Sequence, residues 1–579
     1  MDSLDTSPRP DSPARGEWAL ALAMAAALAT LAVVPLMVFG NVSGHDVEFH
    51  LPNWIDVARH WHEGVFYPHW SGGGHYAFGD PRFIIYPPFS WLLGGLLATL
   101  LPGVLLPGVY VWICVLANAV AAWRLAREWF TPAPAGWAAA LYALNPYLLL
   151  VFTHRCAYAE LLASAFFPLA FLHMLRLARP DRAGMRAALA FAPAFAGLWL
   201  SNVPAAVLGS YGLGFVLLWL AIRGRSLRTL LRGAVGMALG LGLAAFYIVP
   251  IANEMGWIQS EGAFSGGLSL WNNFLFHRSD DGPHTEFNLL VSALACAEMA
   301  LAGAAFPLAI RGLHQSRAQQ DDSQRAGLPV LCALAAVYAL LLFPWSQPVW
   351  RILPRIWMAE FPWRSLYILN LALAMAIIAA MGRAAAAGRR TWPWALLVAI
   401  PWIALGGGVL RLAPWMPDDI HQLVAAANSV EGYEGVVDEF LPKAVDPEKL
   451  QADAPRLVAV DQEGDEADTP GLKTAVTLWN TEEKRFTVDA PEPARIRLHL
   501  VNYRPWRATV NGAALTPETE SDTGQMVIPV PAGHSDVRVW FGHTTDRTLG
   551  PAVSLLALTL LASLWVALSR TRQPDAGSS

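Results

Sequence analysis

Residues 18–39 read WALALAMAAALATLAVVPLMVF, an apolar stretch of 22 residues without a charged side chain. Because an α-helix rises about 1.5 Å per residue, such a stretch covers the roughly 30 Å of hydrocarbon in a bilayer. It is too long for the core of a signal peptide, and it lacks a clear small-residue cleavage site. We therefore expect an uncleaved first membrane span.

Comparable apolar stretches recur along almost the whole chain, which is 55% hydrophobic and only 15% charged. This composition excludes a soluble enzyme, a secreted disulfide scaffold or a disordered protein as a description of the whole. The four cysteines show neither metal-ligand spacing nor a disulfide framework. Eleven further spans are predicted near 104–123, 133–152, 157–178, 186–200, 203–222, 230–252, 287–310, 327–344, 364–382, 392–410 and 550–568.

Arginines between these stretches set the predicted topology. With twelve crossings and a cytoplasmic N-terminus, the clusters all fall on the cytoplasmic side, as the positive-inside bias requires. The clusters are Arg124/Arg127, Arg176/Arg179/Arg182/Arg186, Arg223/Arg225/Arg228/Arg232, Arg311/Arg317/Arg325, Arg383/Arg389/Arg390 and Arg570/Arg572. The apolar stretch Pro87–Pro102 is either a thirteenth span or an interfacial helix, and counting it as a crossing would move most clusters outside.

The predicted organisation is therefore a polytopic α-helical membrane protein with a C-terminal β domain on the outer face. It comprises a cytoplasmic tail 1–16, a membrane domain 17–411 with an outer loop 40–103, an outer domain 412–549, a final span 550–568 and a cytoplasmic tail 569–579. Residues 412–549 carry a net charge of −11 and the rest of the chain +6. No basic, aromatic-rich surface for nucleic acid is present.

The outer domain has the alternation of β-strands. Six strands are predicted at 475–479, 485–488, 496–501, 506–510, 526–530 and 537–541. Asn511-Gly512 is a typical two-residue hairpin turn. An antiparallel sandwich of about a hundred residues is the architecture that these strands favour. Its large aromatic residues could stack on sugar rings, although core packing is their commoner role.

Two carboxylates, Asp46 and Glu48, follow the first span directly within Gly44-His45-Asp46-Val47-Glu48-Phe49-His50. At the membrane surface, partial desolvation would make either one a base for an incoming hydroxyl. Two carboxylates beside a phosphate would also suit a divalent metal ion, although nothing in the sequence demands a cofactor. The alternative is that Asp46 only caps the helix that follows.

Arginines supply the complementary charge. Arg155 stands in a short outer turn before Glu160, and Arg364 closes the stretch Glu360-Phe361-Pro362-Trp363-Arg364. An arginine at the outer end of an apolar helix can bind a phosphate oxygen while its stem stays at the lipid boundary. The substrate would then be a phosphate carried on a lipid. The alternative is that the two arginines form purely structural pairs with Glu160 and Glu360.

Two other features bear on function. Glu298 is the main ionisable residue within a span, and it is either functional or a neutral packing residue. The loop 253–286 is longer than a simple connection and includes a glycine-rich stretch. We expect it to close over the outer cavity, with Trp257 or Trp271 against a sugar, or else to be a disordered surface loop.

These motifs, taken in order, resemble a family. They are the acidic motif at His45–His50, Tyr67-Pro68-His69-Trp70, Tyr86-Pro87-Pro88, His154-Arg155 with Ala159-Glu160, Ser201-Asn202-Val203-Pro204, Phe361-Pro362-Trp363-Arg364, and Tyr433-Glu434 through Glu439-Phe440-Leu441-Pro442. They resemble large bacterial membrane proteins of the YfhO type, some labelled "6-pyruvoyl-tetrahydropterin synthase-related", although no histidine-based zinc site of a pterin synthase is visible. Such proteins are similar to GT-C glycosyltransferases.

The resemblance implies a GT-C-like transferase of the bacterial inner membrane that moves a sugar from a polyprenyl-phosphate donor to a glycan or protein acceptor on the outer face. Asp46 and Glu48 are then the catalytic candidates. The substrate-binding candidates are His50, Tyr86, His154, Arg155, Glu160, Asn202, Glu254, Glu360 and Arg364. The alternatives are a transporter or flippase of lipid-linked saccharides and a non-catalytic scaffold for envelope assembly; a transporter would depend more on groups within the spans, such as Glu298.

Overall fold

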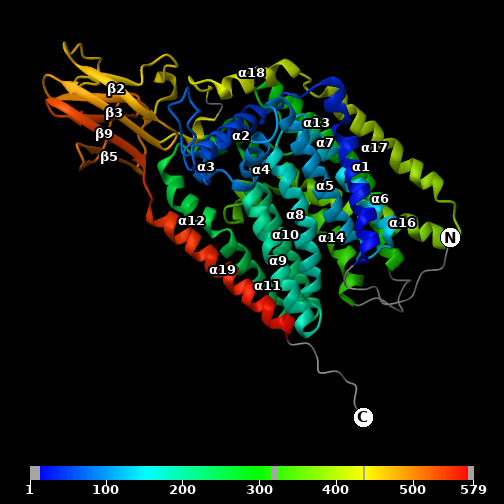
Figure 1. Cartoon of the computed structure of the whole chain (residues 1–579). Coiled ribbons are helices and arrows are strands. Elements are labelled where there is room, and N and C mark those ends of the chain that lie inside the picture. Colours follow the sequence, from blue (N-terminus) through cyan, green and yellow to red (C-terminus); the bar gives the residue numbers. More distant parts are fainter. Residues whose placement is uncertain (1–12, 314–321, 435–436, 571–579) are drawn as a thin grey trace.

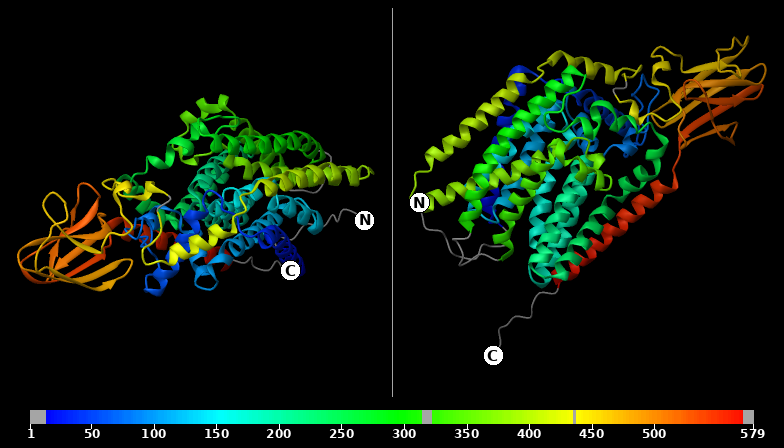
Figure 2. Two further views of the ribbon diagram at one scale, coloured as in Figure 1. Left: turned by 90° about the horizontal axis from the view of Figure 1, so that it is seen from above. Right: turned by 180° about the vertical axis from the view of Figure 1, so that it is seen from behind.

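The structure is a computed structural model that describes residues 13–313, 322–434 and 437–570. A bundle of long helices makes up most of it, and a β-rich domain projects from one end of that bundle (Figure 1). Figure 2 shows the same arrangement from above and from behind. The predicted tails at 1–16 and 569–579 lie almost entirely outside the described residues.

Nine helical segments of the described chain are long and apolar enough to cross a bilayer. They are α1 (Arg15–Phe39), η1 with α5 (Gly103–Leu105 and Leu106–Ala126), α8 (Tyr158–Arg176), α9 (Asp181–Ser201), α10 (Val203–Arg223), α13 (Gly282–Leu313), η8 with α16 (Pro362–Ser365 and Leu366–Ala386), α17 (Trp392–Leu412) and α19 (Thr545–Arg570).

Three further pairs pass the same test jointly but are bent, by 41°, 70° and 100°. They are α6 (Pro132–Ala143) with α7 (Pro146–Thr153), α11 (Leu227–Leu243) with α12 (Ala245–Glu254), and α14 (Asp322–Leu341) with η6 (Pro344–Ser346) and α15 (Gln347–Ile352). If each pair counts as one span, the resulting twelve coincide with the twelve predicted stretches. The prediction of a polytopic helical membrane protein is confirmed.

The bend between α6 and α7 has a local cause. Asn145 precedes Pro146, and a residue before proline is pushed out of the α region into extended backbone. Asn145 accordingly has φ −72° and ψ 151°, and its side-chain oxygen accepts a hydrogen bond from the Leu148 amide at 2.8 Å. The helix therefore stops and restarts with a new cap, which places the outer end of α7 beside α8.

The stretch Pro87–Pro102 forms a short helix, α4 (Pro88–Ala98). Its 11 residues extend only about 16 Å, which is half of a bilayer's hydrocarbon. It packs on α2 (Val47–His62), and a Cβ on Gly94 would collide with the indole of Trp54. Of the two alternatives for this stretch, the structure shows the short helix, in agreement with the topology drawn from the arginines.

Several predicted arginine clusters meet at the end of the bundle away from the β domain. Arg127 pairs with Glu17 at 2.9 Å, which joins the end of α5 to the start of α1. Arg186 donates to the Leu568 carbonyl at 2.8 Å, and Arg383 donates to that of Leu308 at 3.1 Å. Each of these contacts joins two helix ends that the predicted topology places on the same side.

The β domain consists of two antiparallel sheets packed around one apolar core. The strand order is β1-β4-β8-β7 in one sheet and β2-β3-β9-β5-β6 in the other. The strands are β1 (Leu457–Val460), β2 (Lys473–Trp479), β3 (Glu483–Ala490), β4 (Ala494–Val501), β5 (Trp506–Val510), β6 (Ala513–Leu515), β7 (Glu518–Thr519), β8 (Gln525–Val530) and β9 (Gly533–Phe541). All six predicted strands are present, and Asn511-Gly512 turns β5 into β6 with both residues at positive φ.

The predicted outer domain 412–549 contains both a helix and the two sheets. Its sheets occupy only Leu457–Phe541, whereas α18 (Pro417–Asn428) lies along α2 at the end of the bundle. The first loop in turn inserts aromatic rings into the β core, with the Trp70 and Trp506 centroids 5.4 Å apart. The β domain is therefore fixed on the first loop, and the two build one end of the molecule together.

Candidate active site

A cavity of about 490 Å³ opens at the end of the bundle that carries the β domain. Its wall comes from the start of α2, the first turns of α8 and α10, α12, the loop 258–273, the segment 358–364 and the segment 437–440. Most lining side chains are apolar, and a few charged groups converge among them. This size and composition are typical of a site for a small organic ligand.

Asp46 enters the cavity through a backbone junction between the first loop and the turn that follows α7. The His45 amide donates to the His154 carbonyl at 3.2 Å, and the Asp46 amide donates to the Arg155 carbonyl at 2.7 Å. Gly44 permits this approach, because a Cβ there would collide with the His154 carbonyl. Asp46 occupies the cap position of α2, but its carboxylate accepts no cap hydrogen bond. Helix capping therefore does not account for this side chain.

The Asp46 carboxylate is 37% exposed, and its Oδ2 lies 3.9 Å from Nη2 of Arg155. The cation thus neighbours the carboxylate without a direct hydrogen bond. The carboxylate remains free to accept a proton or a hydrogen bond from a ligand in the cavity.

Glu160 is the centre of the charged network behind Asp46, and only 1% of the residue is exposed. It accepts hydrogen bonds from the Tyr147 hydroxyl, from Nη1 of Arg155, and from Nε of Arg364 at 3.1 Å. Arg364 also donates to Glu360 at 2.8 Å. Both structural pairs weighed from the sequence are therefore present, but they belong to one network that faces the cavity.

Among the described residues, each of the two arginines has a guanidinium nitrogen without a hydrogen-bond acceptor. Within the described part of the chain, Nη2 of Arg155 and Nη2 of Arg364 have no hydrogen-bond acceptor. Aromatic rings support both groups, since the Arg155 guanidinium lies 4.9 Å from the Trp363 centroid and that of Arg364 lies 4.4 Å from the Phe361 centroid. Such stacking orients a guanidinium without using its donors.

Glu360 is held in a strained turn at the wall of the cavity. Its backbone has φ 57° and ψ −53°, and the Phe361 amide donates to the Ala359 carbonyl at 2.6 Å. This is a γ-turn of the rarer hand, a conformation that costs on the order of 1–3 kcal/mol for a residue other than glycine. Burial raises the pKa of Glu360, although Arg364 opposes that shift. Strain of this kind is concentrated at binding and catalytic sites.

Seven of the predicted site residues come together on this cavity although they are distant in sequence. They are Asp46, Tyr86, Arg155, Glu160, Asn202, Glu360 and Arg364. The Asn202 side chain also caps α10, accepting from the Ala205 amide at 2.9 Å. Tyr86 packs on Phe49 with ring centroids 4.7 Å apart, which closes one side of the cavity.

Glu48 and His50 do not line the cavity. Successive helical residues rotate by about 100°, so Glu48, two positions after Asp46, points away and is exposed. His50 lies one turn beyond Asp46 but is buried behind Tyr86, 5.7 Å from its ring, and burial lowers the pKa of His50 to about 4. The structure gives neither residue access to a ligand in this cavity.

His154 and Glu254 also lie outside the cavity wall. His154 turns toward α17, where its Nε2 lies 2.8 Å from the Val409 carbonyl. Glu254 is fully buried and receives Arg547 at 2.8 Å and the Tyr503 hydroxyl at 2.7 Å. It joins α12, α19 and the β domain. The side chains of both residues bind other residues of the protein, so neither is placed to contact a ligand in the cavity.

The loop 253–286 does border the cavity, with Ile258, Phe264 and Leu268 among its lining residues. The two tryptophans expected to face a sugar lie elsewhere. Trp257 packs on Tyr503, with ring centroids 5.8 Å apart, and Trp271 lies 5.3 Å from the Arg351 guanidinium. The loop forms several 3₁₀ turns in place of a disordered segment.

Three lining residues with imidazole or carboxyl side chains received no role from the sequence: His45, His284 and Glu439. His45 is the first residue of the acidic motif, and His284 lies in the loop expected to close. Glu439 belonged to the last motif of the family resemblance. Burial raises the pKa of Glu439 to about 7.

Glu298 forms a hydrogen bond within the helical bundle. Its Oε2 accepts a hydrogen bond from the Asn370 side chain at 2.8 Å, which links α13 to α16. The residue is completely buried and does not line the cavity. This contact favours the packing interpretation of Glu298 over a role in transport.

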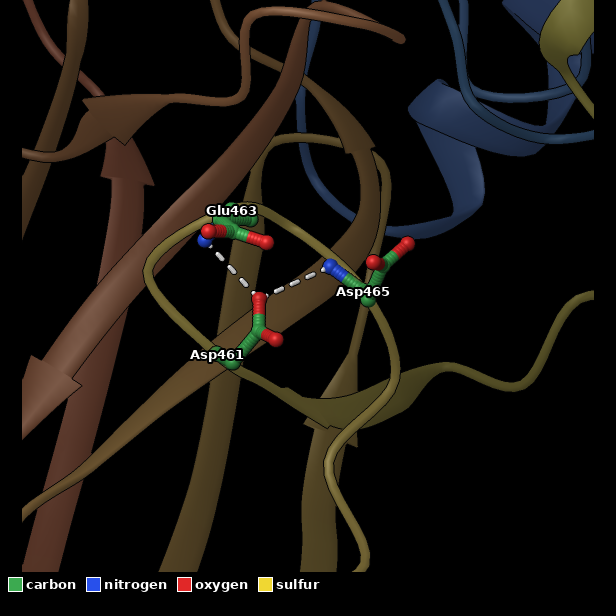
Figure 3. Close-up of side chains that lie close together, drawn as sticks. All are labelled: Asp461, Glu463 and Asp465. Carbon is green, nitrogen blue, oxygen red and sulfur yellow. Dashed lines mark hydrogen bonds between the residues drawn. The ribbon is translucent and has the colours of Figure 1, made fainter.

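A search of the described residues for metal-binding groups gives only Asp461, Glu463 and Asp465, which are exposed at a turn of the β domain. Figure 3 shows the reason for their proximity: Oδ1 of Asp461 accepts the amides of Glu463 and Asp465, at 2.8 and 3.0 Å. The turn itself explains this cluster. Asp46 and Glu48 point apart, so a metal ion bridging them does not fit this structure.

Comparison with known proteins adds only distant likeness. No family model matches the chain, and no curated protein matches it by sequence. The arabinofuranosyltransferase AftD from Mycobacteria aligns at a TM-score of 0.43 and 19% identity, over 71% of this chain and 27% of its own.

The Archaeoglobus fulgidus oligosaccharyltransferase aligns at a TM-score of 0.40 and 14% identity, over 69% of this chain and 57% of its own. ArnT from Cupriavidus metallidurans, solved with undecaprenyl phosphate, gives 0.36 and 14% identity, over 72% of this chain and 75% of its own. The chain thus spans well under two thirds of the length of the first two proteins. Likeness at this level carries no argument about activity.

Proposed function

We propose that this protein is a GT-C-like membrane glycosyltransferase of the YfhO type, which transfers a sugar from a polyprenyl-phosphate donor to an acceptor on the outer face of the bacterial inner membrane. One observation carries the proposal. Asp46, a carboxylate free of capping bonds, lies 3.9 Å from Arg155 on an apolar cavity of about 490 Å³. A base, a cation and an apolar wall are what such a transfer needs.

The arginines are suited to the donor phosphate. Nη2 of Arg155 and Nη2 of Arg364 remain available for phosphate oxygens, while Glu160 fixes both guanidinium groups. Interactions with a phosphate are strongest when the donor groups are preorganised in a site of low dielectric. The apolar residues Val203, Ile251 and Leu268 of the same wall would contact the lipid chain.

In the proposed reaction, Asp46 removes the proton of the acceptor hydroxyl. The acceptor oxygen forms a bond to the anomeric carbon, and the bond between that carbon and the phosphate oxygen breaks. The lipid phosphate leaves with the electron pair, and its negative charge stays beside Arg155 and Arg364. A general base placed in this way contributes about 10²–10⁴-fold to a rate.

The test uses the purified full-length protein with a panel of undecaprenyl-phosphate-linked monosaccharides and an envelope extract as acceptor. Released undecaprenyl phosphate is the product to measure, because every donor yields it. Asp46→Asn should reduce release by about 100-fold or more at unchanged thermal stability. Asp418→Asn, the same change at an exposed position of α18, should have no effect. Full activity of Asp46→Asn, or no release from any donor by the unaltered protein, contradicts the proposal.

A further inference from the structure

Carboxylates outnumber arginines on the wall of the cavity. Asp46, Glu160, Glu360 and Glu439 line it, and within the described residues its permanent cations are Arg155 and Arg364 alone. Both arginines are already engaged by Glu160, and each has a second carboxylate within 4 Å. A donor phosphate would add another negative charge. No permanent cation is left for an anionic group on the second substrate.

Glu439 is the carboxyl group without a counter-ion. No salt bridge of the described chain involves it, and the hydrogen bond that it makes is to its own backbone, whereas Asp46, Glu160 and Glu360 each face an arginine. The charged groups around it are Glu360 across the cavity, Arg82 of α3 (Arg82–Ile85) and Asp438 on its own turn. Arg82 is itself bound to Asp80, at 2.7 Å through Nε.

The position of Glu439 is fixed by its neighbours. It lies in η9 (Asp438–Phe440), where the ring of Phe440 stacks on Phe49 at 5.7 Å. The backbone that follows pairs with the loop 257–259: the Gln259 amide donates to the Leu441 carbonyl at 2.9 Å, and the Lys443 amide to that of Trp257 at 3.1 Å. Backbone hydrogen bonds and ring packing therefore hold the segment that carries Glu439 against the cavity loop.

We propose that Glu439 selects the acceptor of the proposed transfer, admitting an uncharged hydroxyl compound and rejecting one with an anionic group. This inference rests on the proposed function, which makes the second substrate an acceptor. The subsite itself is defined by its selectivity for charge. A carboxyl group can hydrogen-bond a sugar hydroxyl in either protonation state. When ionised, it repels a second carboxylate or a phosphate, because like charges brought together in a poorly solvated site destabilise the complex.

Protonation makes the selection dependent on pH. Burial raises the pKa of Glu439 to about 7, so the group is neutral on the acid side of that value and charged on the alkaline side. Discrimination against anionic compounds should therefore grow as the pH rises through about 7. Glu439→Gln, which stays neutral at every pH, should remove that dependence while it retains a hydrogen-bonding side chain.

The first experiment needs no catalytic activity. Dicyclohexylcarbodiimide adds to protonated carboxyl groups in apolar surroundings and gives a stable N-acylurea that mass spectrometry can locate. Full-length protein in nanodiscs should be labelled at Glu439, and labelling should decline with a midpoint near pH 7. Glu360 falls on a different tryptic peptide and serves as an internal reference. Absence of label on Glu439 at acid pH overturns the proposal.

Protection from labelling then measures selectivity. Methyl β-glucoside and methyl β-glucuronide are matched probes that differ only in the oxidation of one carbon to a carboxylate. Well below the midpoint, where Glu439 is neutral, the two probes should protect it about equally. About one pH unit above the midpoint, where labelling is slower, the neutral probe should protect Glu439 several-fold better than the anionic one. Equal protection by both at the higher pH, or protection by neither at any pH, contradicts the proposal.

The outcomes separate this inference from the proposed function. If the unaltered protein releases undecaprenyl phosphate but Glu439→Gln keeps the same preference for neutral over anionic acceptors, Glu439 is not the selector and the transferase assignment stands. If labelling and protection behave as expected but no donor is cleaved, the subsite stands and the transferase assignment fails.

Discussion

Glu160 and Arg364 are separated by 204 positions in the sequence, yet Oε2 of Glu160 lies 3.1 Å from Nε of Arg364. The same carboxylate binds Arg155, so a single buried anion holds two cations from different parts of the chain. Because Glu160 belongs to α8 and Arg364 to the turn before α16, their contact aligns two spans. The positions of the two guanidinium groups on the cavity wall follow from it.

Glu160→Gln should destabilise the protein strongly. The change leaves two buried guanidinium groups with reduced compensation, and removal of one partner of a buried ion pair costs about 3–5 kcal/mol. The free energy of unfolding of the full chain in detergent measures this loss. Glu483→Gln is the matched control, since Glu483 forms exposed pairs with Arg485 and Arg538 and should cost at most about 1 kcal/mol. Equal effects of the two changes would disprove the role given to Glu160.

Arg155→Met should weaken the binding of undecaprenyl phosphate by about 10- to 100-fold, which corresponds to roughly 1.4–2.8 kcal/mol. The substitution keeps an apolar side chain between Asp46 and Trp363 but removes the guanidinium donors. Native mass spectrometry of the protein with this lipid gives the dissociation constant. Arg351→Met should bind as the unaltered protein does, because Arg351 is exposed beside Trp271 and does not line the cavity. A uniform loss in both variants would indicate general attraction to lipid phosphate.

Gly44→Ala should abolish transfer more than it lowers stability. A Cβ at this position meets the His154 carbonyl and lies 2.9 Å from Sγ of Cys156, so the first loop must move outward. Asp46, two residues later, would leave Arg155, and displacement of a reacting group by about 1 Å can cost 10²-fold in rate. Gly108→Ala is the control, because nothing lies within 4 Å of a Cβ there. Comparable activity in the two variants would refute the placement of Asp46.

His75 should make the stability of the outer end depend on pH. Burial opposes protonation, but hydrogen bonds to Asp438 and Asp80 prevail and raise the pKa of His75. Its ring nitrogens lie 3.3 Å and 3.1 Å from these carboxylates, and both must carry protons to donate. This stabilisation is complete below the unfolded value of about 6.5 and is lost as the pH rises through the higher folded pKa.

The prediction for His75 is checked by thermal unfolding at a series of pH values. The unaltered protein should lose stability as the pH rises above about 6.5, whereas His75→Gln should be less stable at the acid end and show a flatter profile. His62, which is exposed at the end of α2, offers the same substitution as a control. A profile unchanged by His75→Gln would exclude the imidazolium bridge.

The sequence by itself determined the apolar helices and the strands. Each of these depends on a local property: the length of an apolar stretch against the thickness of hydrocarbon, the two-residue period of a half-buried strand, or a turn such as Asn511-Gly512. The motifs around Asp46, Arg155 and Arg364 were also visible, because charged residues at the ends of apolar helices stand out from their surroundings.

Only the tertiary structure decided which of these residues share a site. Asp46 and Glu48 look equivalent in sequence, but the rotation of α2 turns one into the cavity and the other outward. His154 and Glu254 find partners in Val409 and Arg547, which lie 255 and 293 positions away. Glu439 gains its place, and the burial that keeps it partly neutral, from contacts with a loop some 180 residues earlier. Such properties depend on what packs around a side chain, and local sequence does not record that.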